Sequence, residues 1–471
     1  MDRFFKLKEN GTTVRTEVMA GLTTFMTMAY ILAVNPNVLS AFGSGATGMN
    51  WTAVFIATAI AAGVMTIAMG LFVNFPVALA PGMGLNAYFA AVILSSQGKF
   101  TFQMGLTAVF ISGIIFIVLT VTKVRQMLLV AVPDSLKHAI TVGIGLFITI
   151  IGLKNSGLLT VAVEAASDIP KGKYTDVAFF ETVFHIGSLK DANVVLCIVG
   201  LILIAILMVL RVRGAILFGI LLTTLVGVFM HNPDGSPLVN FATLSGEKTT
   251  WVPDLSQMAF GHFDFAGVMN AGIISVIATF TFVELFDTFG TLVGTANRAG
   301  LMKNKEAGQK QVGKAMMVDA IGVSAGALVG TSTVTAYIES AAGVAEGGRT
   351  GLTAVTTGVC FLLALFLAPI AALIPGSATA AALIIVGVLM MQSVREIDFQ
   401  DMVYAIPSFL TIALMPFTYN IANGISFGIV TYVILATVAK LGGKGQYRVH
   451  WLMWILAILI VLRYALIGGE G

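Results

Sequence analysis

The chain has 471 residues, of which 57% are hydrophobic and only 10% are charged. Apolar runs of about 18 residues or more recur from end to end, which excludes a soluble globular protein and indicates a polytopic α-helical membrane protein. The formal net charge of +3 is distributed over short loops, so we expect no nucleic-acid partner. Five scattered histidines and two cysteines in apolar segments, Cys197 and Cys360, indicate neither a metal site nor a disulfide.

Fourteen apolar segments follow one another along the chain, and a further stretch, 450–466, either adds a span or lies at the interface. Two of the fourteen, 84–97 and 336–346, are too short to cross about 30 Å of hydrocarbon alone. Both follow an extended-looking lead-in, so each is predicted to be a short strand leading into a half-helix. The segments are 18–35, 51–73, 84–97, 103–122, 136–152, 192–210, 214–230, 268–295, 312–329, 336–346, 352–373, 378–392, 403–419 and 421–439.

The charges and an internal repeat predict how these segments are oriented. Lysine and arginine gather on the side of the N-terminus, which lacks a cleavable signal peptide, so we expect that end to be cytoplasmic. The stretch 74–89 (NFPVALAPGMGLNAYF) lines up with 330–345 (GTSTVTAYIESAAGVA), and each contains the third segment of a set of seven. Since seven is odd, the two halves are inverted relative to each other, and the half-helices meet near the middle of the membrane.

The stretch 330–351 is the most informative part of the sequence. It opens with β-branched and hydroxyl residues and continues with Glu339, Ser340 and a run of small residues between two strongly apolar segments. Irregular backbone at membrane depth is tolerated only where it is buried in protein or lines a cavity. We therefore interpret this stretch as half of a substrate site.

Carboxylates inside apolar segments are costly and are functional by default. Glu284 and Asp287 lie three residues apart, on one face of a predicted helix, and Glu339 is the third such group. Two adjacent carboxylates do not both ionise cheaply, which suits proton coupling and also recognition of N–H donors on a polar heterocycle. The alternative is that Glu284 or Asp287 pairs with Arg298, Asn297 or a backbone group.

Further polar and aromatic residues lie close to these carboxylates in the sequence. Asn86 follows Gly84 in the first broken segment, and its amide both donates and accepts, as a nucleobase edge requires. Alternatively, Asn86 caps its own half-helix. Phe282 and Tyr337 are candidates for stacking on a planar base, although ordinary helix packing is the commoner role of any single aromatic side chain.

Other charged residues have simpler interpretations. Asp319 is expected to cap a helix or to join helices. Glu346 and Arg349 are expected to form a local ion pair at the cytoplasmic end of the tenth segment.

Four motifs together resemble one family. The chain is similar to the AzgA-like purine permeases, a group within the nucleobase–cation symporter family that also holds the uracil and xanthine permeases. The resemblance covers essentially the whole chain. The motifs are GLTTFMTMAYILAVNP (21–36), PVALAPGMGLNAYF (76–89), VELFDTFGTL (283–292) and TSTVTAYIESAAGVAEGGRTGL (331–352).

The resemblance implies an all-α fold of fourteen segments in two inverted sevens, with a base bound between two domains and imported with protons by an elevator-like movement. Glu284 and Glu339 correspond to the family's two base-binding carboxylates, and Asn86 and Asp287 to polar positions of the AzgA-like branch. Glu284 and Asp287 are the expected proton-coupling groups. The domains would be a core at 16–122 and 267–374, a gate at 123–232 and 375–440, and an extra apolar C-terminal helix at 450–466.

Two departures from the uracil and xanthine branch bear on the substrate. The chain has Met26-Thr27-Met28 where that branch has a Gln-His pair, and Glu339-Ser340 where many xanthine permeases have a Gln/Glu-Asn pair. Both favour adenine, guanine or hypoxanthine. A 6-oxopurine offers an N1–H donor to a carboxylate, which favours hypoxanthine and guanine.

Several other expectations accompany this interpretation. The protein is expected in a bacterial inner membrane, with no cofactor and with H⁺ as the coupling ion, while homodimer formation stays open. A uracil/xanthine-type permease and an anion carrier on the same fold are the alternatives. A membrane-embedded enzyme would need a nucleophile with a base or a metal set, which the scattered histidines and cysteines do not supply.

Overall fold

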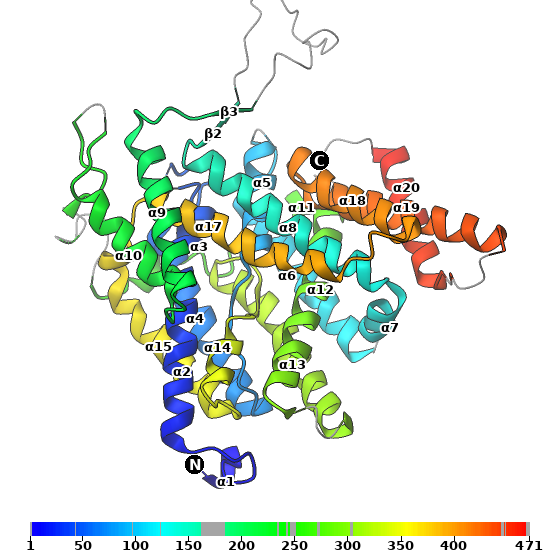
Figure 1. Ribbon diagram of the computed structural model, residues 1–471, viewed down its shortest axis with the longest axis horizontal. Coiled ribbons are helices and arrows are strands. Elements are labelled where there is room, and N and C mark those ends of the chain that lie inside the picture. The colour runs from blue at the N-terminus through cyan, green and yellow to red at the C-terminus, as the bar shows by residue number, and fades with distance from the viewer. Residues whose placement is uncertain are drawn as a thin grey trace, which may run out of the picture.

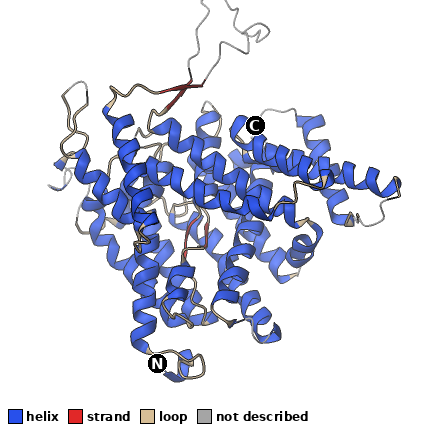
Figure 2. Cartoon of the chain, viewed as in Figure 1, coloured by secondary structure: helices blue, strands red, loops and turns tan. Residues whose placement is uncertain are grey.

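The structure is a computed structural model in which apolar helices pack side by side around a pair of short strands (Figures 1 and 2). It describes residues 2–42, 44–96, 98–122, 124–161, 184–232, 235–241, 244, 251–270, 274–301, 305–443, 447 and 449–467. Within α12, the side chains of Asp287, Asn297 and Arg298 lie outside the described part.

The first half of the chain supplies helices α1 to α10 and strands β1 to β3. Strands β2 and β3 pair with each other outside the helical bundle (Figure 1). The bounds are α1 Asp2–Phe5, α2 Val14–Met28, α3 Ile31–Leu39, α4 Trp51–Ala68, β1 Leu79–Pro81, α5 Met83–Ser95, α6 Phe102–Val121, α7 Val124–Ala131, α8 Asp134–Asn155, β2 Leu159–Val161, β3 Phe184–Ile186, α9 Ala192–Val209 and α10 Ala215–Gly227.

The second half supplies helices α11 to α20 and strand β4. The bounds are α11 Phe265–Asn270, α12 Ile274–Arg298, α13 Lys305–Val329, β4 Val334–Ala336, α14 Ser340–Ala345, α15 Gly351–Leu363, α16 Ala368–Ala371, α17 Gly376–Met391, α18 Met402–Phe417, α19 Ile421–Leu441 and α20 Trp451–Ile467.

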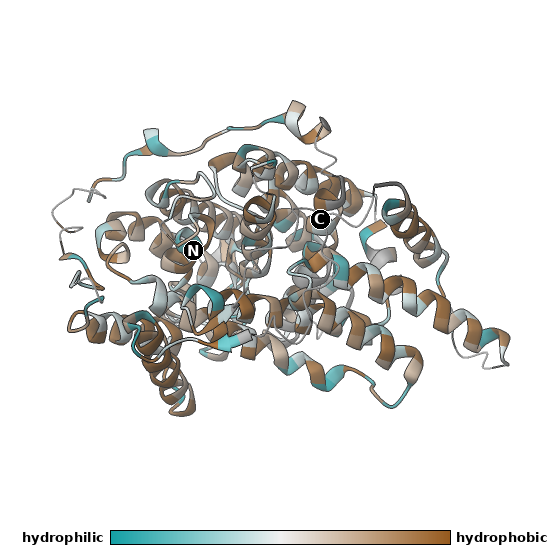
Figure 3. Ribbon diagram, turned by 90° about the horizontal axis from the view of Figure 1, so that it is seen from above, coloured by the Kyte–Doolittle hydropathy of each residue, from teal (hydrophilic) through white to brown (hydrophobic). Residues whose placement is uncertain are grey.

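Length and hydropathy identify the molecule as a helical membrane protein. Among the described residues, nine helical stretches are long and apolar enough to cross a membrane, and the shorter apolar helices α5, α10, α18 and α20 accompany them. Hydrophobic residues predominate along the helices (Figure 3). Large apolar side chains such as Phe72 and Leu441 are mostly exposed, as lipid-facing residues are.

The predicted segments correspond to helices, with several breaks that the hydropathy pattern does not show. The segment predicted at 18–35 consists of α2 and α3, which are separated at Ala29 and Tyr30. After α4 the helix widens into a π-helical turn, Met69–Val73, and ends at Asn74 with a left-handed φ of 55°. The short helix α7 was not predicted.

The extended lead-ins predicted before the two short segments are confirmed as β1 and β4. These strands pair antiparallel, with Leu79 opposite Ala336 and Pro81 opposite Val334. One predicted boundary was wrong: α14 begins at Ser340, not near 336, because Val334–Ala336 are held extended by β1. Two short strands thus satisfy each other's backbone groups at membrane depth.

The helices around this strand pair pack in two sets. In one set, α13 packs on α6 and α4, and α15 packs on α4 and α2. In the other set, α17 lies along α8 and α9, and α18 packs on α8 and α19. Helices α5 and α12 contact α8 of the second set. The strand pair, with α5 and α12, therefore lies at the boundary between the two sets of helices.

Candidate functional site

A small cavity lies where the two broken segments meet. Its volume is about 90 Å³, and its wall combines exposed backbone, one carboxylate, hydroxyl groups and apolar side chains. Helices α8 and α17 close it from the opposite side. The described lining residues are Tyr30, Gly82, Met83, Gly84, Leu85, Ile144, Val283, Thr291, Thr335, Ala336, Tyr337, Ile338, Glu339, Val386 and Met390.

Backbone hydrogen bonds between the two broken segments build this wall. The N–H of Gly82 donates to the carbonyl of Thr333 at 3.0 Å, and the N–H of Tyr337 donates to the carbonyl of Ala78 at 3.0 Å. Ser340 is fully buried, and its hydroxyl accepts from the N–H of Ala78 at 3.0 Å. Ser340 therefore joins the two segments and lies outside the described cavity lining.

Glu339 is the carboxylate that reaches the cavity. It directly precedes α14, and its Oε1 accepts a hydrogen bond of 2.9 Å from the hydroxyl of Tyr30. Tyr30 is itself 1% exposed and lies at the break between α2 and α3. A carboxylate fixed by one donor still offers acceptor positions to a ligand.

Glu284 lies on α12 beside the cavity. Its neighbour Val283 is part of the lining, while Glu284 itself is fully buried. The position of the Asp287 side chain lies outside the described residues, so its predicted proximity to Glu284 stays a prediction.

Asn86 occupies a buried polar network behind the cavity wall. Its Nδ2 donates to Oδ1 of Asn35 at 2.5 Å, and its Oδ1 accepts from the hydroxyl of Ser332. Asn35 in turn donates to the hydroxyls of Thr58, at 2.7 Å, and Thr331, at 3.0 Å. The amide of Asn86 therefore links α5 to α3 and to the lead-in of β4.

The remaining predicted residues take different positions. Tyr337 lines the cavity, and its hydroxyl donates to the carbonyl of Pro81. Gly84 also lines it, and a Cβ at this position would lie 2.5 Å from Cγ2 of Ile144 on α8. Phe282 is half-buried and packs against the hydrophobic core.

The structure reveals interactions that the sequence did not predict. No pattern in the sequence singled out Tyr30 as the hydrogen-bond partner of Glu339. Asp319, expected to join helices, forms a buried ion pair with Arg125 and also binds β4. The predicted local pair of Glu346 with Arg349 was wrong: Glu346 pairs with Arg213 at 2.6 Å, and Arg349 donates to backbone carbonyls.

The described residues contain little that would hold a metal or form a disulfide. Within them, no three histidine, cysteine, aspartate or glutamate side chains come together as metal ligands do. Cys197 and Cys360 are both free thiols, the first buried and the second partly exposed.

Comparison with known proteins identifies the class. The family model described as the Permease family matches residues 15–427. The chain belongs to this family and is therefore a multi-pass membrane transporter rather than an enzyme. Its resemblance to nucleobase permeases is confirmed.

Individual relatives are similar over nearly their full lengths. The chain is 42% identical over 473 residues to the adenine permease AdeP of Escherichia coli (strain K12), covering 100% of this chain and 97% of the relative. It is 40% identical over 466 residues to the guanine/hypoxanthine permease PbuO of Bacillus subtilis (strain 168), covering 98% of this chain and 99% of the relative.

A solved structure shares the fold. The transmembrane domain of the cyanobacterial bicarbonate transporter BicA superposes with a TM-score of 0.56 at 16% identity, covering 89% of this chain and 97% of that chain. At this identity the likeness concerns the arrangement of helices alone.

Proposed function

We propose that this protein imports purine nucleobases across the plasma membrane, with hypoxanthine and guanine preferred over adenine. The observation that carries the proposal is the Tyr30–Glu339 pair in a small cavity between two broken segments. A cavity that presents backbone, a carboxylate and apolar walls suits a small planar heterocycle with polar edges.

The chemistry of the cavity supports a 6-oxopurine. Glu339 would accept the N1–H of hypoxanthine or guanine, a donor that neutral adenine lacks. The apolar side chains of Ile144, Val283 and Met390 would cover the faces of the ring. The relatives support a purine but differ in the base, since AdeP is named for adenine and PbuO for guanine and hypoxanthine.

The proposed architecture has fourteen membrane segments in two inverted repeats of seven. Segments in 16–122 and 267–374 form a core that carries the broken segments, and those in 123–232 and 375–440 form a gate. The two packing sets support this division for most helices, because α8 and α17 face the cavity from the gate side. The short helix α7 is the exception, since it packs on α6 and α12 and would move with the core. The core would move against the gate as an elevator, with the N-terminus cytoplasmic.

Proton coupling is the proposed source of energy, with no other cofactor. Glu284 and Asp287 are the proposed proton carriers, because a buried carboxyl group near the binding site exchanges a proton in step with binding. Protonation from outside would favour base binding, and loss of the proton inside would release the base. The full burial of Glu284 supports this role.

The test is uptake of radiolabelled hypoxanthine by cells that lack their own purine carriers, with unlabelled adenine, guanine, xanthine and uracil as competitors. Competition by guanine alone is the predicted outcome. Competition by adenine as well would mean that the site recognises the ring more than its 6-substituent. Uptake that continues at full rate with an uncoupler present would reject proton coupling.

An anion carrier is the second candidate, because the fold is shared with a bicarbonate transporter. Glu339 in the cavity wall argues against it, since a carboxylate repels a bound anion. Bicarbonate uptake in the absence of purine uptake would favour this alternative.

A further inference from the structure

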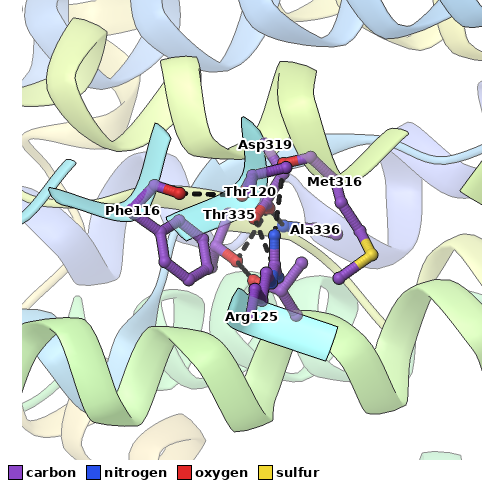
Figure 4. A network of polar contacts seen from close by, with 8 residues as sticks. Phe116, Thr120, Arg125, Met316, Asp319, Thr335 and Ala336 are labelled. Atoms are coloured by element: carbon purple, nitrogen blue, oxygen red, sulfur yellow. Dashed lines mark hydrogen bonds and ion pairs between the residues drawn. The ribbon is translucent and has the colours of Figure 1, made fainter. Parts of the chain in front are cut away.

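A buried ion pair lies next to Thr335 and Ala336 of β4, the strand that precedes Glu339 (Figure 4). Arg125 on α7 and Asp319 on α13 are 1% and 0% exposed, with Nη2 of the arginine 3.9 Å from Oδ2 of the aspartate. The other oxygen of Asp319, Oδ1, accepts from the hydroxyl of Thr335 at 3.1 Å and from the N–H of Ala336 at 2.9 Å. Asp319 therefore binds β4 through both a side chain and the backbone.

These bonds provide a hydrogen-bond acceptor for the edge of β4 that faces away from β1. The strand pair has two members, and the neighbouring N–H of Tyr337 is directed at β1. Successive N–H groups of a strand point in opposite directions, so that of Ala336 points away from β1 and needs another acceptor. Asp319 provides it, and Thr335 is further fixed by the hydroxyl of Thr288 on α12 at 2.9 Å.

Arg125 offsets the charge that this arrangement buries. Its guanidinium lies 4.0 Å from the centre of the Phe116 ring and donates to the carbonyl of Met316 at 3.2 Å. A buried carboxylate without a counter-charge is strongly destabilising. The guanidinium of Arg125 supplies this counter-charge at 3.9 Å from Oδ2 of Asp319, without a hydrogen bond between Nη2 and Oδ2.

We propose that Arg125 and Asp319 are positioning residues for base binding. Thr335 and Ala336 line the cavity, and Glu339 follows three residues after Ala336. Asp319 holds this strand at the depth and angle that place Glu339 against the base, and Arg125 holds Asp319. The inference rests on the proposed function, and neither residue needs to touch the base.

The test compares two double variants that each remove the buried charges together. Arg125→Met with Asp319→Asn keeps an acceptor oxygen for Ala336, whereas Arg125→Met with Asp319→Leu keeps only the volume. Equilibrium binding of radiolabelled hypoxanthine to the purified protein is measured for both. The Asn form should bind close to wild type, and the Leu form should bind about tenfold more weakly or worse, the loss expected when a buried donor such as the N–H of Ala336 is left without an acceptor.

A second measurement does not depend on the ligand. Amide hydrogen exchange in a peptide covering 334–340 of the ligand-free protein should be faster in the Leu form than in the Asn form. Equal exchange and equal binding in two folded double variants would overturn the proposal. If wild type binds no purine, the proposed function fails, and the exchange result alone still decides the positioning role.

If the variant with Asp319→Leu does not fold, the single variant Arg125→Met tests the proposal instead. This variant leaves the charge of Asp319 without its partner, so it should bind hypoxanthine less well than the variant that also carries Asp319→Asn. Wild-type binding and exchange in Arg125→Met would reject the part assigned to Arg125.

Discussion

The hydroxyl of Tyr30 donates a 2.9 Å hydrogen bond to the carboxylate of Glu339 across 309 residues of sequence. The bond joins a break between two helices to the turn before α14, so two irregular stretches of backbone meet at one point. It fixes the carboxylate at the cavity wall before any ligand arrives. Such preorganisation lowers the ordering cost of binding.

Removing this hydroxyl should therefore weaken base binding. Tyr30→Phe keeps the ring and deletes the donor, and we expect hypoxanthine affinity to fall about tenfold, the loss for one hydrogen bond to a charged group. Tyr464→Phe is the matched control, because it deletes a tyrosine hydroxyl bonded to Asn423 at 2.6 Å on the distant α19–α20 pair. Equal affinities for wild type and Tyr30→Phe would show that the bond does not orient Glu339.

A steric prediction concerns the boundary between α5 and α8. Gly84→Ala would place a methyl group against Cγ2 of Ile144, and overpacking of this kind costs about 1–3 kcal/mol. Hypoxanthine uptake should fall in Gly84→Ala. The double variant Gly84→Ala with Ile144→Ala should transport hypoxanthine as well as Ile144→Ala alone, because the shortened side chain leaves room for the added methyl group. Gly313→Ala, where a Cβ would meet nothing within 4 Å, is the control. Wild-type uptake by Gly84→Ala would contradict the close approach.

Glu17 provides a prediction about stability. Its buried carboxylate accepts from the N–H groups of Arg349 (2.9 Å), Thr350 (3.2 Å) and Thr353 (3.2 Å) at the start of α15, where a negative charge is favourable. Glu17→Gln should lower the free energy of unfolding by about 1–3 kcal/mol.

The measurement is the thermal unfolding midpoint of the purified protein. Glu9→Gln is the control, because its pair with Lys6 is exposed and such pairs contribute about 0–1 kcal/mol. If Glu17→Gln and Glu9→Gln unfold at the same temperature, the carboxylate of Glu17 does not stabilise the start of α15.

The ion pair between Arg213 and Glu346 provides a prediction about transport rate. It links the loop between α9 and α10 to the end of α14, and hence the proposed gate to the proposed core. Reversing either charge alone should change the uptake rate by up to about fivefold, because partly exposed pairs contribute at most about 1 kcal/mol. Reversing both charges should restore the rate, and hypoxanthine affinity should stay unchanged in all three variants.

Lys137→Gln is the control for this pair, because the bond of Lys137 to Asp134 lies within α8 alone. A large loss of affinity in the Arg213 or Glu346 variants would show that the pair shapes the binding site instead of the movement.

Local sequence patterns predicted the broken segments because their causes are local. Pro76, Pro81 and the glycines interrupt helix formation, and the β-branched residues before Ala336 favour a strand. Glu339 could be predicted because a carboxylate in an apolar segment is costly wherever it lies.

Other parts of the site depend on contacts between distant segments. The chain breaks at Tyr30 without an adjacent glycine or proline, so hydropathy gave no indication of it. The sequence around Arg125 indicates only a basic residue in a loop, and the packing of α7 places it beside Asp319. Asn86 was predicted to face a base or to cap its own half-helix, and its amide is bonded to Asn35 and Ser332. No single-sequence pattern specifies such pairings.

The most direct test is hypoxanthine uptake by wild type and Glu339→Gln at equal amounts in the membrane of cells without purine carriers. Uptake by wild type should exceed that of cells without the protein. Uptake should fall about tenfold or more in Glu339→Gln, because the amide replaces a charged acceptor with a group that is half donor. Wild-type uptake by Glu339→Gln would contradict base binding by the Glu339 carboxylate.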